Sequence, residues 1–396
     1  MYGNSKDSPS KNEDVKIVIK SSFTIAQSGS KSFMDDFRFI FISFYLVGIE
    51  VQETEDYASI PRSYRVCKKT TIRYAVRCCL TNFIFVIFTL KILAKAYNVT
   101  IGEEIRNQFP ILIIGILKVT LYISVYRKRR HILKIMENLN QELKMCPKCN
   151  LRKEKYSLVA FFTFATLFCV VWYAIDFHFR CGRRIIHQCL VGVLLLKPFI
   201  SCFIEINDFL FYFVGNIILP SFIMFYMLVC ILSRIIFQHI RDNLGLVRVL
   251  EDFQKLVTLH EHTLNNLEYF DKNFSFSFFI TILLTMIGIF RCGYSVAFID
   301  DNPTLLNAYS ISSMFLYMLY QLLLMIAGSI TNEATNDTSN VLKNRYNKDF
   351  KSPKLEVDFS QNSLTIWKIY KLDRSLIISS FGTLLTFGIL LGTLGK

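Results

Sequence analysis

The segment Ser375–Lys396 reads SLIISSFGTLLTFGILLGTLGK and contains no charge before Lys396 and no proline. An apolar segment of this length can cross the roughly 30 Å hydrocarbon core of a membrane as a helix. It predicts a last transmembrane helix at 375–395. Small or hydroxyl side chains recur along it at helical spacing, which fits either close packing against another helix or the lining of a narrow pore. This weakly polar stripe comprises Ser375, Ser379, Gly382, Thr383, Thr386 and Thr393.

The remainder of the chain also has the composition of a membrane protein. Of its 396 residues 52% are hydrophobic, 37 are Phe and only 19% are charged, which is less charge than soluble domains usually carry. We therefore predict an all-α polytopic membrane protein with seven transmembrane helices. The other six apolar segments lie at 73–97, 109–126, 157–176, 207–236, 274–298 and 308–330.

Two further apolar segments are harder to assign. The run at 37–49 is too short to cross a membrane, so we expect an interfacial helix there. The run at 190–204 is interrupted by Lys197 and Pro198. We expect an outer loop that lies against the membrane, with an additional span as the alternative.

The basic residues predict the orientation. The tail 1–72 and the loops 127–156, 237–273 and 331–374 hold 10, 10, 4 and 8 Lys and Arg, whereas the alternate segments together hold 6. The positive-inside rule then places the amino terminus in the cytosol and the carboxyl terminus outside. The net charge of +14 follows the ends of the apolar segments, so it indicates a membrane surface and not nucleic acid.

The amino-terminal residues 1–32 are polar, and we expect a disordered cytosolic tail without a signal peptide. Residues 33–396 then form the transmembrane domain. The glycosylation sequon that begins at Asn98 falls in the first predicted outer loop, which agrees with this orientation.

The predicted inner loops carry amphipathic patterns. Apolar residues in 236–273 recur mostly every three or four positions, with acidic residues between them, which predicts helices that continue out of the fourth span and into the fifth. Leu364, Trp367 and Tyr370 repeat that spacing just before the last span. We expect these helical extensions to pack together as a cytosolic bundle that anchors the protein.

Polar side chains within the predicted spans are candidates for a ligand site. Lys118 and Arg291 lie inside spans, where a charge is costly; each either reaches the interface or backbone carbonyls, or faces a polar site. Aromatic and polar residues in the outer halves of the spans are ordinary for a membrane interface, and together they could also line a pocket. The candidates are Trp172, Tyr173, Tyr212, Asn216, Arg291, Tyr294, Tyr309 and Tyr317.

Other chemistry finds little support. Cys146 and Cys149 form one CxxC pair without the further ligands that a tetrahedral zinc site requires. Cys181 and Cys189 in the outer segment are candidates for a disulfide. We find no nucleophile motif, phosphate loop or metal-ligand cluster, so we expect neither an enzyme nor a cofactor or metal.

The last span resembles the arthropod gustatory receptor family, which is related to the insect odorant receptors. That family carries Thr-Tyr, five apolar residues and Gln-Phe near the chain end. The matching positions here are Thr386–Phe387, the run Gly388–Gly392 and Thr393–Leu394. The departures from the motif are Phe for Tyr, and Thr-Leu for Gln-Phe. The preceding Leu372–Arg374 and the last span itself are similar to chelicerate members.

The resemblance implies a tetrameric ligand-gated cation channel in the plasma membrane, homomeric or formed with related subunits. Four last spans would surround the pore, Leu390 and Leu394 would form its hydrophobic gate, and Thr393 would replace the Gln beside it. Thr386 would also line the pore. The leading hypothesis is a gustatory receptor that opens to cations when a small-molecule tastant binds.

Two other classes remain open. A seven-span G-protein-coupled receptor would need the opposite orientation and usually has a proline in its last span, which is absent here. A small-molecule transporter is disfavoured because no acidic residue lies deep in any predicted span.

Overall fold

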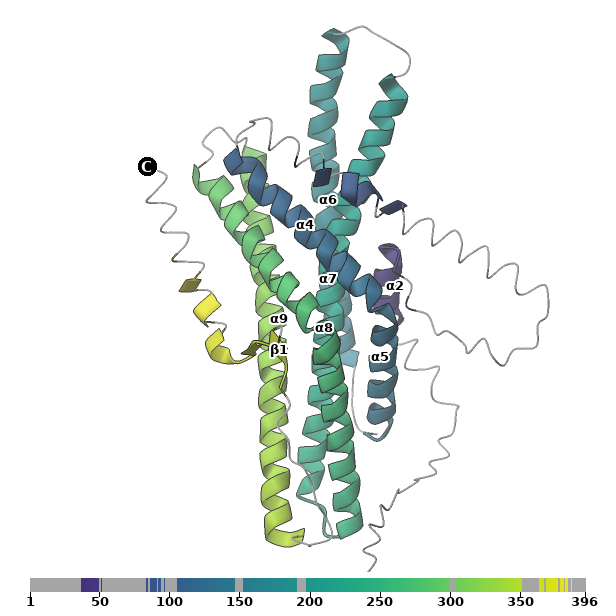
Figure 1. The fold of residues 1–396 in the computed structure, drawn as a ribbon, viewed down its shortest axis with the longest axis vertical. Helices are drawn as coiled ribbons and strands as arrows, with labels where there is room; N and C mark the ends of the chain where they lie inside the picture. The colour runs from purple at the N-terminus through teal and green to yellow at the C-terminus, as the bar shows by residue number, and fades with distance from the viewer. Residues whose placement is uncertain are drawn as a thin grey trace, which may run out of the picture.

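The structure is a computed structural model of the chain (Figure 1). The side chains of 105–108, 152, 176–190, 197–208, 298, 306 and 350 lie outside this description, as do the predicted tail 1–32 and most of the first predicted span. The described residues are 37–49, 51, 83–84, 86–90, 92–93, 96, 105–146, 152–190, 197–298, 304–350, 363–366, 368–376, 378–380, 382–383 and 386.

Nearly all of the described chain is helical. Its elements are α2 (Arg38–Leu46), α4 (Ile105–Arg127), α5 (Arg129–Lys144), α6 (Arg152–Leu190), α7 (Lys197–Leu244), α8 (Leu250–Phe298), α9 (Thr304–Arg345), the π-helical turn η2 (Tyr346–Phe350), and the strands β1 (Thr365–Ile366) and β2 (Tyr370–Lys371).

Among the residues that the structure describes, five helices are long and apolar enough to cross a membrane. Their candidate spans are Phe109–Arg127 in α4, Lys153–Ile175 in α6, and long stretches of α7, α8 and α9. Together with the composition, they define a multi-pass helical membrane protein. The described residues of 83–96 and 374–386 are helical as well, where the sequence predicts the first and last spans.

Helix α7 forms the centre of the core. It contacts α2, α4, α5, α6, α8 and α9, and it runs through the middle of the view in Figure 1. Its side chains Phe222, Phe225 and Phe237 are fully buried. Phe225 packs edge-on against Phe44 of the short helix α2 and against Phe274 of α8, so the core extends from α2 across to α8.

The helical extensions predicted for 236–273 are present. Helix α7 continues to Leu244, and α8 begins at Leu250 after a turn at Gly245. Most apolar positions of the pattern face the interior on both helices, for example Ile236, Ile240, Phe253 and Phe270, whereas Leu250 is exposed. These extensions pack with α5 and the far part of α9 into one helical bundle (Figure 1).

The helix predicted around Leu364–Tyr370 is wrong. This segment is a two-stranded antiparallel hairpin in which Thr365 pairs with Lys371 and Ile366 with Tyr370. Lys368 at its turn has a φ of 58°, which no helix residue adopts. Of the three apolar positions, Leu364 is buried, Tyr370 is 62% exposed and Trp367 lies outside the described residues, so the spacing does not mark one buried helix face.

The outer loop predicted at 190–204 is wrong for most of its length. Helix α6 extends to Leu190, and α7 begins at Lys197; 191–196 lie outside the described residues. Pro198 does not break a helix here because it lies in the first turn of α7, where the missing N–H has no helical partner to lose. Residues 197–204 are therefore helical.

A buried histidine in the bundle predicts a pH dependence of stability. Nε2 of His260 on α8 lies 3.1 Å from Oγ of Ser339 on α9, and burial lowers the pKa of His260 to about 4. The unfolded chain therefore binds a proton that the folded chain excludes. The resulting contribution of neutral His260 to folding stability is fully present above pH 6.5. It is lost as the pH falls toward 4, to a total of about 3 kcal/mol.

The contribution is best measured as a difference between wild type and His260→Gln in thermal unfolding from pH 7.5 to 4.5. Glu142 on α5 titrates with the opposite sign, since burial raises its pKa to about 7, and the subtraction removes it. We expect wild type to lose stability relative to the variant as the pH falls. The exposed His262 provides the matched control His262→Gln. Parallel pH profiles for wild type and His260→Gln would contradict the prediction.

Candidate functional site: an aromatic cluster joined to the last helix

The predicted aromatic residues gather between α6, α7 and α9. The Trp172 and Tyr309 ring centroids are 5.1 Å apart, and those of Tyr173 and Tyr212 are 5.2 Å apart. The hydroxyls of Tyr212 and Tyr309 are hydrogen-bonded, and Tyr309 also bonds Ser313. Three helices thus contribute aromatic side chains to one cluster. The sequence named these residues as candidates, and the structure shows which of them are in contact.

Two predicted polar residues meet at the α4–α7 contact. Lys118 Nζ donates a hydrogen bond of 2.6 Å to Oδ1 of Asn216. Gly215 provides the space for the lysine, because a Cβ at that position would lie 3.2 Å from Cδ of Lys118. The ammonium is thereby held inside the membrane-spanning part of the helices by an amide oxygen.

Arg291 on α8 joins the cluster from the other side. Tyr309 and Tyr317 both lie within electrostatic reach of its guanidinium. Tyr317 packs over Gly288, where a Cβ would lie 2.8 Å from two ring carbons, so this glycine makes room for the ring. Tyr294 follows Arg291 by one turn of α8 and is half-buried.

The structure also places residues here that the sequence did not single out. Tyr320 is buried, and its ring lies 5.8 Å from that of Phe161 and 6.4 Å from that of Tyr317. Cys169 of α6 lies near Lys118 and Tyr320. Their spacing along the helices is the signal that could have found them. Cys169 is four residues from Tyr173 and Tyr320 is three residues from Tyr317, so each shares a helix face with a predicted member.

The hairpin before the last helix is clasped by α8 and α9. The Asn332 side chain donates to the carbonyl oxygens of Leu364 (3.0 Å) and Leu372 (2.8 Å) and accepts from the Leu364 N–H (2.7 Å). Asp271 accepts from the Thr365 N–H at 2.8 Å and from its hydroxyl. Burial raises the pKa of Asp271, and the bonds from Thr365 oppose that effect. We call Asp271, Asn332 and the hairpin 364–372 the clasp.

Side-chain packing reinforces the clasp. A Cβ on Gly328 would lie 2.8 Å from Cδ1 of Leu372 and 3.0 Å from the Tyr226 hydroxyl, so Leu372 fills a notch that only glycine leaves open. Tyr226 is itself stacked on Phe278 with ring centroids 4.6 Å apart. The hairpin is therefore seated against the α7–α8–α9 core.

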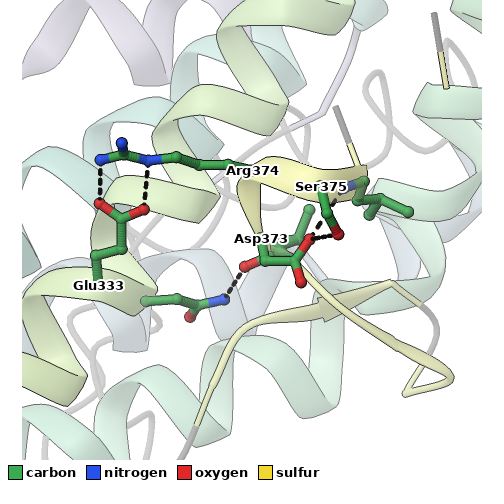
Figure 2. Close-up of polar contacts among 7 residues, drawn as sticks. Glu333, Asp373, Arg374 and Ser375 are labelled. Atoms are coloured by element: carbon green, nitrogen blue, oxygen red, sulfur yellow. Dashed lines mark hydrogen bonds and ion pairs between the residues drawn. The ribbon is translucent and has the colours of Figure 1, made fainter. Parts of the chain in front are cut away.

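Polar residues fix the start of the last helix (Figure 2). Arg374 forms a two-bond ion pair with Glu333 on α9, Nε to Oε1 at 2.6 Å and Nη2 to Oε2 at 2.7 Å. Asp373 Oδ1 accepts from the Ser375 hydroxyl and from the Leu376 N–H, as an N-cap does. These two bonds lower the pKa of Asp373. Arg374 thus ties the last helix to α9, and Asp373 caps its first turn.

A second contact joins the last helix to α9 further along. Nε2 of Gln321, which is fully buried, lies 3.4 Å from Oγ of Ser380. Beyond it, Thr386 is helical and exposed, and its hydroxyl bonds the Gly382 carbonyl of the same helix. Helix α9 therefore carries Tyr309 and Tyr317 in one part and the contacts to the last helix in another.

Several predicted residues lie outside the described part of the chain, namely Asn98, Leu390, Thr393 and Leu394, and also Cys149. Cys181 and Cys189 lie on α6, but their side chains are outside the description. Among the described residues, no group of three or more His, Cys, Asp or Glu could hold a metal ion.

The chain folds like an insect olfactory receptor. It superposes on the olfactory receptor OR5 from Machilis hrabei with a TM-score of 0.59 and 12% identity, over 91% of this chain and 98% of that one. The same receptor in complex with eugenol gives a TM-score of 0.56 at 12% identity, over 92% and 100% of the two chains. No family model and no curated protein sequence matches this chain. At this identity, the likeness establishes a shared fold.

Proposed function

We propose that this protein is a chemosensory receptor of the gustatory type that acts as a tastant-gated, non-selective cation channel in the plasma membrane. The observation that carries the proposal is the fold shared over nearly the whole length with an olfactory receptor that has been solved with a small molecule, eugenol. The motif-like ending of the last span adds to it. The amino terminus is cytosolic, the last spans of four subunits surround the pore, and Leu390 and Leu394 form the gate, with Thr393 and Thr386 lining the pore.

The aromatic cluster is the proposed ligand site. Aromatic rings with hydroxyl groups, one amide and two cations suit a small, partly apolar molecule that has hydrogen-bonding groups. The site has contributions from α4, α6, α7, α8 and α9. Trp172, Tyr173, Tyr212, Asn216, Arg291, Tyr294, Tyr309 and Tyr317 are its proposed residues.

Helix α9 is the proposed transmission element. It is a single helix of 42 residues that contains no proline, so a shift of Tyr309 or Tyr317 on ligand binding moves it as a rigid body. Gln321 and the clasp pass that movement to the last helix. Ligand binding then favours the state in which the last helices move apart, the constriction at Leu390 and Leu394 widens, and water and ions enter.

Current recording tests the function. Cells that express the full chain, alone and with related receptor subunits, are exposed to sugars, bitter compounds and amino acids, and a cation current within milliseconds of application is expected. Replacement of Leu394 by Ser should raise the basal current or alter the evoked one, because a polar ring removes the hydrophobic constriction. Responses that require a G protein, or an extracellular amino terminus in epitope labelling of intact cells, would contradict the proposal. Unchanged currents in Leu394→Ser would contradict the gate assignment alone.

The Gln321–Ser380 contact gives a test of transmission. Gln321→Leu keeps the volume of the side chain but removes its hydrogen bond, so the ligand concentration for half-maximal current should change by about five- to ten-fold with unaltered surface expression. Thr338→Val is the matched control, because the Thr338 hydroxyl bonds only the Ala334 carbonyl of its own helix. Equal shifts in both variants would rule out a specific role for the contact.

A further inference from the structure

Four consecutive basic residues mark the junction between α4 and α5. The candidate span of α4 is Phe109–Arg127, so Arg127 is its last residue, and Lys128, Arg129 and Arg130 follow directly. Helix α5 then runs along the bundle with Ile132, Ile135 and other apolar side chains buried. The four basic residues therefore lie at the boundary between the apolar span and the water-exposed bundle.

Aromatic rings and a carbonyl hold part of this basic cluster in place. The Arg129 guanidinium lies 4.3 Å from the centroid of the Tyr126 ring, and its Nη1 donates to the Tyr126 carbonyl at 3.1 Å. Lys128 donates to the carbonyl oxygen of Asn273 on α8. One turn further along α5, Nζ of Lys134 lies 5.0 Å from the centroid of the Tyr269 ring. These contacts order the cations without neutralising them.

Within the described part of the chain, no recorded ion pair neutralises the four basic residues. Ion pairs are recorded for Lys255, Arg345 and Arg374, whereas none within the described residues involves a residue of 127–130. Arg127 and Arg130 are exposed. His131 senses the excess charge: its pKa is lowered by burial and further by the neighbouring cations Lys128 and Lys134. His131 therefore lies close to at least two cations.

We propose that Arg127, Arg129 and Arg130, with Lys128 and Lys134, bind the phosphate of an anionic phospholipid headgroup. Guanidinium groups match phosphate oxygens with paired hydrogen bonds. A soluble phosphate would present the same oxygens, but the position of the cluster at the end of an apolar span favours a phosphate whose acyl chains lie along α4. The general excess of cations in inner loops accounts for the number of basic residues here. It does not account for the contacts of Arg129 and Lys134 with tyrosine rings. This proposal is independent of the channel function.

The experiment uses the full chain in nanodiscs of phosphatidylcholine, alone or mixed with phosphatidylserine or a phosphorylated phosphatidylinositol. Native mass spectrometry measures which lipids stay bound. Wild type should retain anionic lipid preferentially, and Arg127→Gln with Arg130→Gln should reduce that relative affinity about 30-fold, since each basic side chain near an anionic surface contributes roughly five-fold. Both side chains are exposed, so the variant should unfold at the wild-type temperature in phosphatidylcholine.

The matched control is Arg241→Gln with Arg248→Gln, which removes two exposed arginines from the far end of the bundle. It should keep the lipid preference. No preference for anionic lipid in wild type, or an equal loss in the control, would overturn the proposal. Inorganic phosphate provides the second arm: stabilisation of wild type, but not of the Arg127→Gln, Arg130→Gln variant, in phosphatidylcholine alone would assign the site to a soluble anion and overturn the lipid source.

Discussion

Replacing Asn332 with aspartate is expected to open the clasp. The side-chain amide of Asn332 donates to two backbone carbonyls and its oxygen accepts one N–H, all in a buried position. Aspartate has the same shape but has no amide donor, so an oxygen would face the Leu364 and Leu372 carbonyls, as a buried charge or as a carboxyl with one proton. The expected cost is about 3–5 kcal/mol, a large share of typical folding stability.

Limited trypsin digestion measures this effect directly. Lys368, Lys371 and Arg374 are cleavage sites in or beside the hairpin, and they should be cut much faster in Asn332→Asp while the helical bundle remains resistant. Asn340→Asp makes the same chemical change at an exposed position on the same helix and should leave the digestion pattern unchanged. Equal protection of the hairpin in wild type and Asn332→Asp would show that the clasp contributes little.

Gly288→Ala should weaken the response to ligand strongly without preventing folding. The added Cβ would lie 2.8 Å from two carbons of the Tyr317 ring, so the ring must move away from α8 and from Arg291. Such overpacking costs about 1–3 kcal/mol, which corresponds to an increase of about five- to 150-fold in the half-maximal ligand concentration if the Tyr317 position is part of the bound state. Concentration–response recording with the first agonist found measures it, with surface labelling to confirm expression.

The same helix offers a control for this variant. A Cβ on Gly293 would lie 3.9 Å from Sδ of Met314, an ordinary contact, so Gly293→Ala should respond like wild type. A wild-type response from Gly288→Ala would place the ligand away from Tyr317. Equal losses in both alanine variants would point to a general intolerance of α8 to substitution.

The sequence predicted most helices because hydrophobic length and period report directly on burial in lipid and protein. The apolar pattern of 236–273 predicted the continuation of α7 and α8, since it depends only on helical spacing. The hairpin escaped prediction because Leu364 and Tyr370 satisfy a helical spacing by chance, and its strands are stabilised by Asn332 and Asp271, which are distant in sequence. The start of α7 was not predicted because a proline such as Pro198 can either interrupt a helix or lie in its first turn. The local sequence does not show where the helix begins.

The residues of the aromatic cluster were predicted from the sequence, but the contacts among them were not. Composition indicated that Trp172, Tyr212 and Tyr309 could line a pocket, yet which rings touch depends on how α6, α7 and α9 cross. The importance of Gly215 and Gly288 could not be inferred either. A glycine in an apolar helix says that something approaches closely, and only the fold identifies Lys118 and Tyr317 as the side chains that do.

The sequence separation of the clasp contacts implies an order of assembly. Asp271 and Thr365 are 94 residues apart, and Asn332 and Leu372 are 40 apart. Contacts across such distances carry a larger loop-closure entropy than the local pairing of successive helices, and they have no surface to dock on until α8 and α9 lie together. The hairpin is therefore expected to dock late. Until then the notch at Gly328, which Leu372 fills in the folded protein, stays open, so a chain whose hairpin has not docked exposes a surface that the folded chain covers.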